Sequence, residues 1–351
     1  MQALVTTPGV EGSTQVVDLP DARPRGPELL VRTLEVGVCG TDREISDGLF
    51  GVAPDDDERL VLGHEFLGVV ETPGRGFARG DLVAATVRRA CGRCGACRIG
   101  APDACETGEY RERGITRLNG FASELVAEAP EHLVPVPRSL GRLGVLAEPA
   151  SICERGLRHV LAVGSRQPWT PKRALVLGTG AIGMLGTYLL RLLDHQVWTA
   201  GRAPHGGEKE ALVTACGAAY VSVAEAPLAA LAEDTGGFDL VLEATGDAQV
   251  MLDGIGLLRR NGVACLLGID GRPRRVSIDG RVLGVDMILQ NRAVFGSVNA
   301  HRTDWQAAVE HLDRARARWP EALEAFVGLR VAVDRYGDAF AFRGVKATLR
   351  F

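Results

Sequence analysis

The spacing of apolar and polar positions divides the chain into two parts of different character. Up to about Leu146, short β-type runs such as LLVRTLEVGV and LVLGHEFLGVV are separated by turn residues at short intervals. This pattern is typical of a compact β-rich domain with long functional loops. Beyond Leu146, apolar strands alternate with helical stretches, which indicates a parallel sheet covered by helices on both faces. The sequence therefore predicts an α/β protein with two domains.

The second part opens with the run RALVLGTGAIGMLGTYLLRLLDHQVWTAGR. It predicts an apolar strand, a glycine turn, an amphipathic helix and a second strand. Further strands are expected in FDLVLEATG, GVACLLGI and AVFGSV, and at VGLRVAV and GVKATLRF after them. Helices are expected at 157–163, 250–258 and 304–318.

The composition of the chain mainly excludes certain classes of partner and location. The chain has 351 residues, 46% hydrophobic and 24% charged, with a net charge of −4. No basic patch is interleaved with aromatic residues, which argues against a nucleic-acid partner. The first residues lack the pattern of a secretory signal, and no apolar run is long enough for a transmembrane helix. We therefore expect a cytoplasmic protein with no membrane partner.

Four of the eight cysteines form a cluster, Cys91, Cys94, Cys97 and Cys105. Four thiolates on one glycine-rich loop are a usual form of closed structural zinc site. An iron–sulfur cluster also takes four thiolates, although usually with other spacings, and chance clustering is the remaining alternative. The scattered Cys153, Cys216 and Cys265 are expected to be small buried apolar side chains.

The glycine turn is Gly178-Thr179-Gly180-Ala181-Ile182-Gly183. It fits the pattern G-x-G-x-x-G between a predicted strand and a predicted helix, which is the context a dinucleotide-binding turn requires. The three glycines would give a tight turn, close approach to a pyrophosphate, and close packing of helix on strand. The alternative is a strand-to-helix turn that binds nothing.

The residues after the second strand bear on the choice of cofactor. An NAD-preferring site usually offers a carboxylate there to the ribose hydroxyls. This chain has Thr199-Ala200-Gly201-Arg202 instead, and the arginine favours the 2′-phosphate of NADP. Alternatively, Arg202 is a solvated surface residue.

A second group of candidate ligands is spread along the first part. Cys39 follows one apolar strand, His64 and Glu65 follow another, and Glu148 lies in LAEPAS. A thiolate, an imidazole and a carboxylate supply three protein ligands and leave a fourth position open, which is typical of catalytic zinc. Each residue alone is unremarkable, so the hypothesis rests on their combination.

Together these motifs resemble the zinc-containing medium-chain dehydrogenases over essentially the whole chain. The order is GVCGTD, GHE, a four-cysteine lobe and a G-x-G-x-x-G domain. CETGEYRERGI, LAEPASICE and GSVNAH resemble the archaeal-type glucose (aldose) 1-dehydrogenases. The resemblance implies a GroES-like catalytic domain at 1–153 and 299–351, and a doubly wound Rossmann domain at 154–298. It also implies a homo-oligomer, either a dimer or a tetramer.

The family's site residues fall on definite positions. The resemblance implies catalytic zinc on Cys39, His64 and Glu148, with Glu65 nearby and Asp42 orienting His64. Its sugar contacts fall on Thr41, Arg89, Glu112, Glu148 and Asn299, with Thr41 also able to relay a proton. Its cofactor contacts fall on the glycine turn, Arg202, Leu267, Gly268, Ile269, Ser297, Val298 and Asn299.

The implied reaction is zinc-dependent, NAD(P)-dependent oxidation of glucose or a related aldose at the anomeric carbon to the lactone. Two positions depart from the family: Ala203 replaces a second basic residue, which leaves NAD open, and Gln290 stands where a histidine can occur. The alternatives are a dehydrogenase of another polyol, an aminocyclitol or a secondary alcohol. A more distant alternative is an inactive nucleotide-binding protein.

Overall fold

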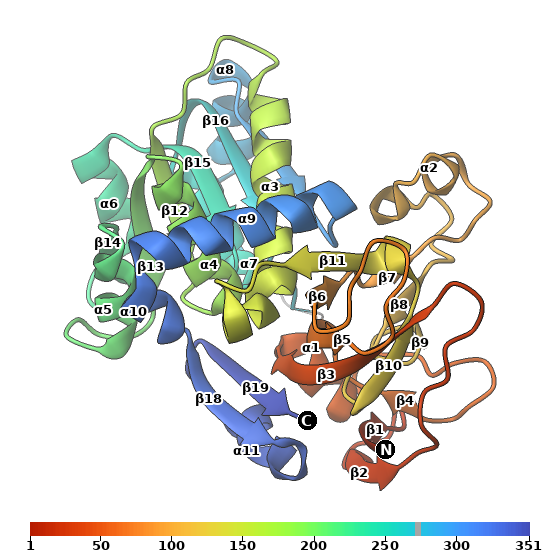
Figure 1. Cartoon of the computed structure of the whole chain (residues 1–351). Helices are drawn as coiled ribbons and strands as arrows, with labels where there is room; N and C mark the ends of the chain where they lie inside the picture. The colour runs from red at the N-terminus through yellow and green to blue at the C-terminus, as the bar shows by residue number, and fades with distance from the viewer. Residues whose placement is uncertain (271–274) are drawn as a thin grey trace. The chain divides into compact units, whose positions relative to one another are not determined.

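The computed structural model describes residues 1–270 and 275–351 and forms two compact units. The first unit is built from Met1–Ser151, Asn299–Asp313 and Val327–Phe351. The second is built from Ile152–Val298 and Arg314–Phe326. Figure 1 shows both, with the first unit containing the red strands and the second the green ones.

This division differs from the expected one at residues 152–153 and, more substantially, at Arg314–Phe326. The sequence assigned all of 299–351 to the catalytic domain, whereas Arg314–Phe326 packs with the second unit. Aromatic packing explains the difference, because the ring of Tyr188 lies 5.3 Å from that of Trp319 and 4.7 Å from that of Phe326. The boundary between Ser151 and Ile152 falls inside α3 (Ala147–Gly164), and the boundary between Asp313 and Arg314 falls inside α9 (Arg302–Arg318).

The first unit is β-rich. Its largest sheet has the order β11-β6-β5-β3-β19-β18, with β10 also paired to β3, and two three-stranded sheets have the orders β2-β1-β4 and β7-β8-β9. Its strands are β1 (Gln2–Thr6), β2 (Gln15–Asp18), β3 (Leu29–Val38), β4 (Leu60–Val61), β5 (Glu65–Val70), β6 (Leu82–Ala85), β7 (Arg88–Arg89), β8 (Arg111–Arg113), β9 (Arg117–Leu118), β10 (Leu125–Glu128), β11 (Leu133–Val136), β18 (Val327–Ala332) and β19 (Lys346–Arg350). Its helices are α1 (Gly40–Ser46), α2 (Gly95–Arg98), η1 (Pro102–Ala104), η2 (Pro130–His132), η3 (Gly141–Leu146), η5 (Val333–Arg335) and α11 (Tyr336–Ala341).

Strand β3 is the central strand of the largest sheet. It pairs with β5, placing Gly37 opposite Glu65, and with β19, placing Val38 opposite Ala347. Apolar side chains of β3 join a core that also contains Leu4 and Phe66. The register therefore brings residues from the early and late parts of the chain to the end of β3, where Cys39 follows.

The second unit is a six-stranded parallel sheet in the order β14-β13-β12-β15-β16-β17. Its strands are β12 (Arg173–Leu177), β13 (Gln196–Gly201), β14 (Ala219–Ser222), β15 (Phe238–Glu243), β16 (Leu258–Leu266) and β17 (Ala293–Gly296). Its helices are α4 (Ala181–Leu192), α5 (Glu208–Ala215), α6 (Leu228–Thr235), α7 (Ala248–Gly256), η4 (Val282–Asp286), α8 (Met287–Leu289) and α10 (Pro320–Glu324). All six residues of β15 are buried, as expected for a central strand covered on both faces.

The strand order reverses at β12, because β13 and β14 extend to one side of it and β15 to β17 to the other. In doubly wound sheets, ligands bind outside the carboxyl ends of the strands at such a switch point. The glycine turn follows β12 directly. The predicted α/β architecture is confirmed.

The expected helix at 157–163 is longer than predicted. It is α3, which begins at Ala147 and ends at Gly164. Pro149 is tolerated because it lies in the first turn, where the backbone N–H has no partner within the helix. Glu148 thus lies in a helical first turn and not in a loop. Among the described residues, no helix is long and apolar enough to cross a bilayer.

Candidate active site and zinc lobe

The four clustered cysteines come together around α2. The Sγ atoms of Cys91, Cys94, Cys97 and Cys105 all lie within 4.8 Å of one another. Cys94 caps the helix, because its Sγ accepts a hydrogen bond of 3.4 Å from the backbone N–H of Cys97. The Thr107 hydroxyl and nearby backbone N–H groups lower the pKa of Cys91 to about 5. This arrangement of thiolates fits a tetrahedral metal ion.

A second cluster forms where β3 ends and β5 begins. Cys39 Sγ lies 3.2 Å from His64 Nε2, and the ligand atoms of Cys39, His64 and Glu65 lie within 4.8 Å of one another. Cys39 is the N-cap of α1, and Glu65 is the first residue of β5. Gly63, at φ 86°, makes the turn before His64. The structure thus brings together three of the residues that the sequence proposed as zinc ligands.

Asp42 lies beside this cluster in the first turn of α1. Its Oδ2 accepts a 2.9 Å hydrogen bond from the backbone N–H of Cys39. Its Oδ1 lies 3.6 Å from Nδ1 of His64, and neither atom has a hydrogen-bond partner among the described residues. Asp42 therefore fixes the backbone of one candidate ligand and faces the ring of another.

The electrostatics of this cluster suit a cation. Burial, followed by the charge of Asp42, raises the pKa of Cys39. Burial also raises the pKa of Glu148 to about 7. The charge of His64 acts to lower this pKa, and the charge of Glu65 acts to raise it. The buried anionic forms are therefore destabilised, and a nearby dication would relieve that cost. Glu148 is close enough to interact with His64 but lies outside the 4.8 Å set.

Glu65 has a partner that the sequence analysis missed. Nζ of Lys346, on β19, lies 2.6 Å from each Glu65 carboxylate oxygen, and both side chains are only 2% exposed. Burial alone would lower the pKa of Lys346, but the charges of Glu65, Cys39 and Glu148 and the hydrogen bond to Glu65 together outweigh burial, so the pKa is raised. A lysine within the expected strand GVKATLRF was the available signal.

The backbone between the two charges must be glycine. β3 lies between β5 and β19, so the Glu65 carboxylate reaches Lys346 across Gly37. A Cβ atom at position 37 would lie 1.9 Å from Oε2 of Glu65. This close approach explains a glycine near the end of a central strand, where it otherwise weakens packing.

Glu112 and Asn299 meet in the first unit despite their separation in sequence. Nδ2 of Asn299 donates a 2.9 Å hydrogen bond to Oε1 of Glu112, and Nε of Arg88 donates one of 3.0 Å to the same oxygen. Two residues further along, a Cβ atom at Gly114 would lie 2.4 Å from the carbonyl oxygen of Gly63. The turn that follows β8 therefore touches the backbone that leads into His64.

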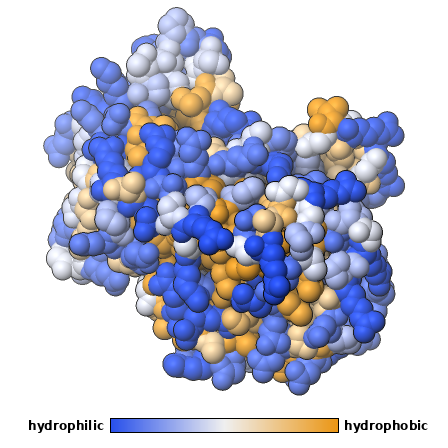
Figure 2. Space-filling view, viewed as in Figure 1, coloured by the Kyte–Doolittle hydropathy of each residue, from blue (hydrophilic) through white to orange (hydrophobic). Residues whose placement is uncertain are grey.

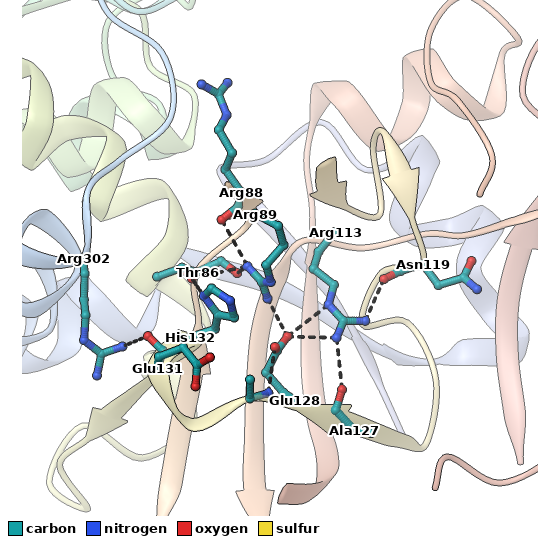
Figure 3. A network of polar contacts seen from close by, with 11 residues as sticks. Thr86, Arg88, Arg89, Arg113, Asn119, Ala127, Glu128, Glu131, His132 and Arg302 are labelled. Carbon is teal, nitrogen blue, oxygen red and sulfur yellow. Dashed lines mark hydrogen bonds and ion pairs between the residues drawn. The ribbon is translucent and has the colours of Figure 1, made fainter. Parts of the chain in front are cut away.

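Arg89, proposed above as a sugar contact, is engaged elsewhere. Its guanidinium donates to Glu128 at 2.5 Å and to the carbonyl oxygen of Thr86 at 2.7 Å. Arg113 also donates to Glu128, at 3.0 Å. Figure 3 shows Arg89 and Arg113 converging on Glu128, whereas the side chain of Arg88 extends away from it. The structure therefore brings Arg88, and not Arg89, to Glu112.

The glycine turn has the shape that a dinucleotide requires. Gly178 adopts φ 113°, and a Cβ atom at Gly183 would lie 2.0 Å from the carbonyl oxygen of Gly178. A Cβ atom at Gly180 would meet nothing within 4 Å, so the backbone there is open to a ligand. Gly180 is the N-cap of α4, whose first N–H groups are available to phosphate oxygens.

Two basic residues lie beside this turn. Arg202 follows β13 directly and is exposed, and its side chain makes no ion pair or hydrogen bond within the described part of the chain. Nζ of Lys209 donates a 2.5 Å hydrogen bond to the carbonyl oxygen of Thr179. The sequence analysis had missed Lys209 as a basic residue beside this turn.

The other proposed cofactor contacts follow two neighbouring strands. Leu267, Gly268 and Ile269 come after β16, and Ser297 and Val298 come after β17. Leu267 is buried, whereas Ile269 is 72% and Val298 53% exposed. All five therefore lie at the same edge of the sheet as the glycine turn.

Comparisons with known proteins agree with this fold. Residues 25–138 match the family model of the alcohol dehydrogenase GroES-like domain, and residues 141–350 match that of the glucose dehydrogenase C-terminus. The glucose 1-dehydrogenase of Methanocella arvoryzae is 41% identical over 338 residues, covering 95% of this chain and 94% of that protein. The glucose 1-dehydrogenase 1 of Caldivirga maquilingensis is 38% identical over 346 residues, covering 97% and 96%.

A solved structure matches over the same extent. It is the glucose dehydrogenase of Haloferax mediterranei in complex with NADP, zinc and gluconolactone, with 32% identity, a TM-score of 0.92, and coverage of 100% of this chain and 99% of that one. A GroES-like unit joined to a Rossmann unit defines a dehydrogenase of the medium-chain type. Within that class, the chain belongs to the glucose dehydrogenase family, as the sequence motifs predicted.

Proposed function

We propose that this protein oxidises glucose or a closely related aldose at the anomeric carbon, giving the lactone, with NADP as the preferred hydride acceptor and zinc as cofactor. The observation that carries the proposal is the buried cluster of Cys39, His64 and Glu65, in one chain with an open dinucleotide turn. It is supported by the solved relative, which holds NADP, zinc and gluconolactone.

The catalytic metal would be held by Cys39, His64 and Glu148. Glu65 lies within reach, but its carboxylate is bound by Lys346, so we propose that it is available to the metal only when that ion pair opens. When bound, zinc supplies a Lewis acid for the substrate hydroxyl, and the nicotinamide accepts the hydride. Cys91 and the other three lobe cysteines would hold a second, structural zinc.

The substrate would be oriented by polar side chains of the first unit. Thr41, in the first turn of α1, offers a hydroxyl that can accept the substrate proton. Glu112 and Asn299, already joined by a hydrogen bond, would fix neighbouring sugar hydroxyls. Such contacts discriminate strongly, because a substrate that lacks one hydroxyl leaves a buried polar group without its partner.

The cofactor would lie along the carboxyl edge of the second unit's sheet. Gly180 and the first turn of α4 would bind the pyrophosphate. Arg202 would bind the 2′-phosphate, since it is exposed and its side chain has no partner within the described residues. Lys209 would add positive charge beside the same turn.

The deciding experiment uses His64→Ala, assayed with zinc-loaded enzyme on a panel of aldoses, polyols and simple alcohols with NADP and NAD. We expect the variant to lose turnover and one zinc per chain while it still binds NADP, because the glycine turn belongs to the other unit. His132→Ala serves as a matched control, because this histidine lies 3.3 Å from the hydroxyl of Thr86 and belongs to neither group of candidate metal ligands. A His64→Ala protein that oxidises glucose at the wild-type rate would refute the zinc mechanism.

We also propose a cytoplasmic homo-oligomer. None of the eight cysteines forms a disulfide, which suits a reducing compartment.

The proposed assembly rests on the edge of the parallel sheet. β17 is an edge strand, and the nearby Ile288 and Leu289 are 68% and 66% exposed. A second copy pairing at this edge would cover them. Ile99, which follows α2, is 83% exposed. Figure 2 shows further hydrophobic residues at the surface among the hydrophilic ones. Light scattering on Ile288→Glu tests the edge, and an unchanged mass would exclude it.

A further inference from the structure

The guanidinium of Arg88 is held by three different groups. Its Nε donates a 3.0 Å hydrogen bond to Oε1 of Glu112, and its Nη1 donates one of 3.1 Å to the carbonyl oxygen of Asp103. Its planar face lies 3.7 Å from the ring centroid of Tyr110. The side chain is only 6% exposed. An arginine held in this way has essentially one conformation, so the groups it contacts are fixed relative to one another.

The two oxygens of Glu112 have different surroundings. Oε1 accepts from both Arg88 and Asn299, whereas Oε2 makes no hydrogen bond to any residue of the described part of the chain. A carboxylate with one oxygen fixed and the other available is well suited to accept a hydrogen bond from a substrate hydroxyl. The direction of Oε2 is set by the partners of Oε1.

We infer that Arg88 is a positioning residue for sugar recognition: it orients Glu112 and, through Asp103, makes the sugar site depend on the four-cysteine lobe. The inference rests on the proposed function, because it takes Glu112 to be a sugar contact. Arg88 itself is not assigned a contact with the substrate.

The link to the lobe follows from the place of Asp103 in the chain. Asp103 belongs to η1, which ends one residue before Cys105, a proposed ligand of the structural zinc. Metal binding at Cys105 therefore fixes the backbone carbonyl that binds Arg88. Loss of that zinc should weaken sugar binding even though the lobe supplies no reacting group.

Lysine cannot replace Arg88 in this role. Its single ammonium has no planar face to stack on Tyr110 and no rigid pair of donors to hold Glu112 and Asp103 at once. Arg88→Lys keeps the charge and removes the geometry, so it separates positioning from simple charge neutralisation. Arg113→Lys is the matched control, because Arg113 lies on the same strand as Glu112 but forms its buried ion pair with Glu128.

The experiment measures kcat and KM with glucose and with each monodeoxy glucose, at saturating NADP, on enzyme with verified zinc content. Glu112→Gln first identifies the hydroxyl that Glu112 recognises, as the one whose removal is no longer penalised. Arg88→Lys should raise the KM for glucose about tenfold with little change in kcat, because one charge-assisted contact is lost. It should also lose discrimination at that same hydroxyl, and the double variant should be no worse than Glu112→Gln alone.

The outcomes separate this inference from the function on which it rests. If the wild type oxidises no sugar, the proposed function is wrong. If the wild type is active but Arg88→Lys behaves like Arg113→Lys, or its effect adds to that of Glu112→Gln, the positioning role is wrong. Should Arg88→Lys fail to fold, Tyr110→Leu removes only the stacking ring. It should raise the KM in the same direction by about threefold, and an unchanged KM would refute the inference.

Discussion

Substitution of either residue of the buried ion pair Lys346–Glu65 should strongly lower the stability of the first unit. Lys346→Met keeps most of the volume and removes the charge, leaving the Glu65 carboxylate buried without its cation. Removing one partner of a buried ion pair typically costs about 3–5 kcal/mol. Both side chains here are 2% exposed and both oxygens are in contact at 2.6 Å, so we expect a value within that range.

Calorimetry measures this cost on protein freed of the catalytic zinc, because a Glu65 released from Lys346 could otherwise bind that ion. For a unit of this size, the expected loss corresponds to a fall in Tm of roughly 10 °C. Glu65→Gln alone should also be destabilising, but the double variant should lose much less than the sum of the two, because no buried charge is left without a partner. Arg32→Met is the control: it breaks a 2.8 Å ion pair with Glu71 in which the arginine is 48% exposed, and should change the Tm much less. Additive effects of Lys346→Met and Glu65→Gln would refute this reasoning.

Three further predictions concern the zinc lobe, the cofactor and pH. Cys94→Ser should lose one zinc per chain and lower the Tm while retaining most of kcat; full zinc content, measured by metal analysis, would contradict the four-thiolate site. Arg202→Ala should raise the KM for NADP by at least about tenfold and that for NAD far less, and steady-state kinetics showing equal changes would make Arg202 a bystander. Burial, followed by the charge of Arg89, lowers the pKa of His132 from 6.5 to about 4. Between pH 6.5 and 4, His132 is therefore protonated in the unfolded chain but not in the folded protein. Stability should therefore fall as the pH decreases from 6.5 to 4, and His132→Gln, compared by thermal unfolding, should lose this part of the pH dependence.

Periodicity predicted the parallel sheet well, because its central strands are continuous apolar runs separated by helices. It predicted the unit boundary less well. Arg314–Phe326 begins inside the long helix α9, where the pattern has no break, and the edge-to-face contacts of Trp319 and Phe326 with Tyr188 join it to the second unit. Such long-range aromatic packing leaves no local signal in the sequence.

The candidate site was predicted through residue types that carry chemistry, namely cysteine, histidine and acidic residues after strands. Its supporting residues were missed because their roles depend on register. Lys346 becomes a partner of Glu65 only when β19 pairs beside β3, and Arg88 was passed over for its neighbour Arg89. Two adjacent arginines on a strand face opposite sides, and the sequence alone did not indicate which side holds Glu112.

The insertion of β19 beside β3 also constrains the order in which the protein folds during synthesis. Strand β3 emerges from the ribosome early, but its neighbour β19 is made only after every segment of the second unit. The parallel sheet can therefore close while the larger sheet of the first unit still exposes the part of β3 that pairs with β19. Until Lys346–Arg350 is synthesised, the Glu65 carboxylate has no cation to pair with. We therefore expect chaperones or early metal binding to stabilise the incomplete sheet most during that interval.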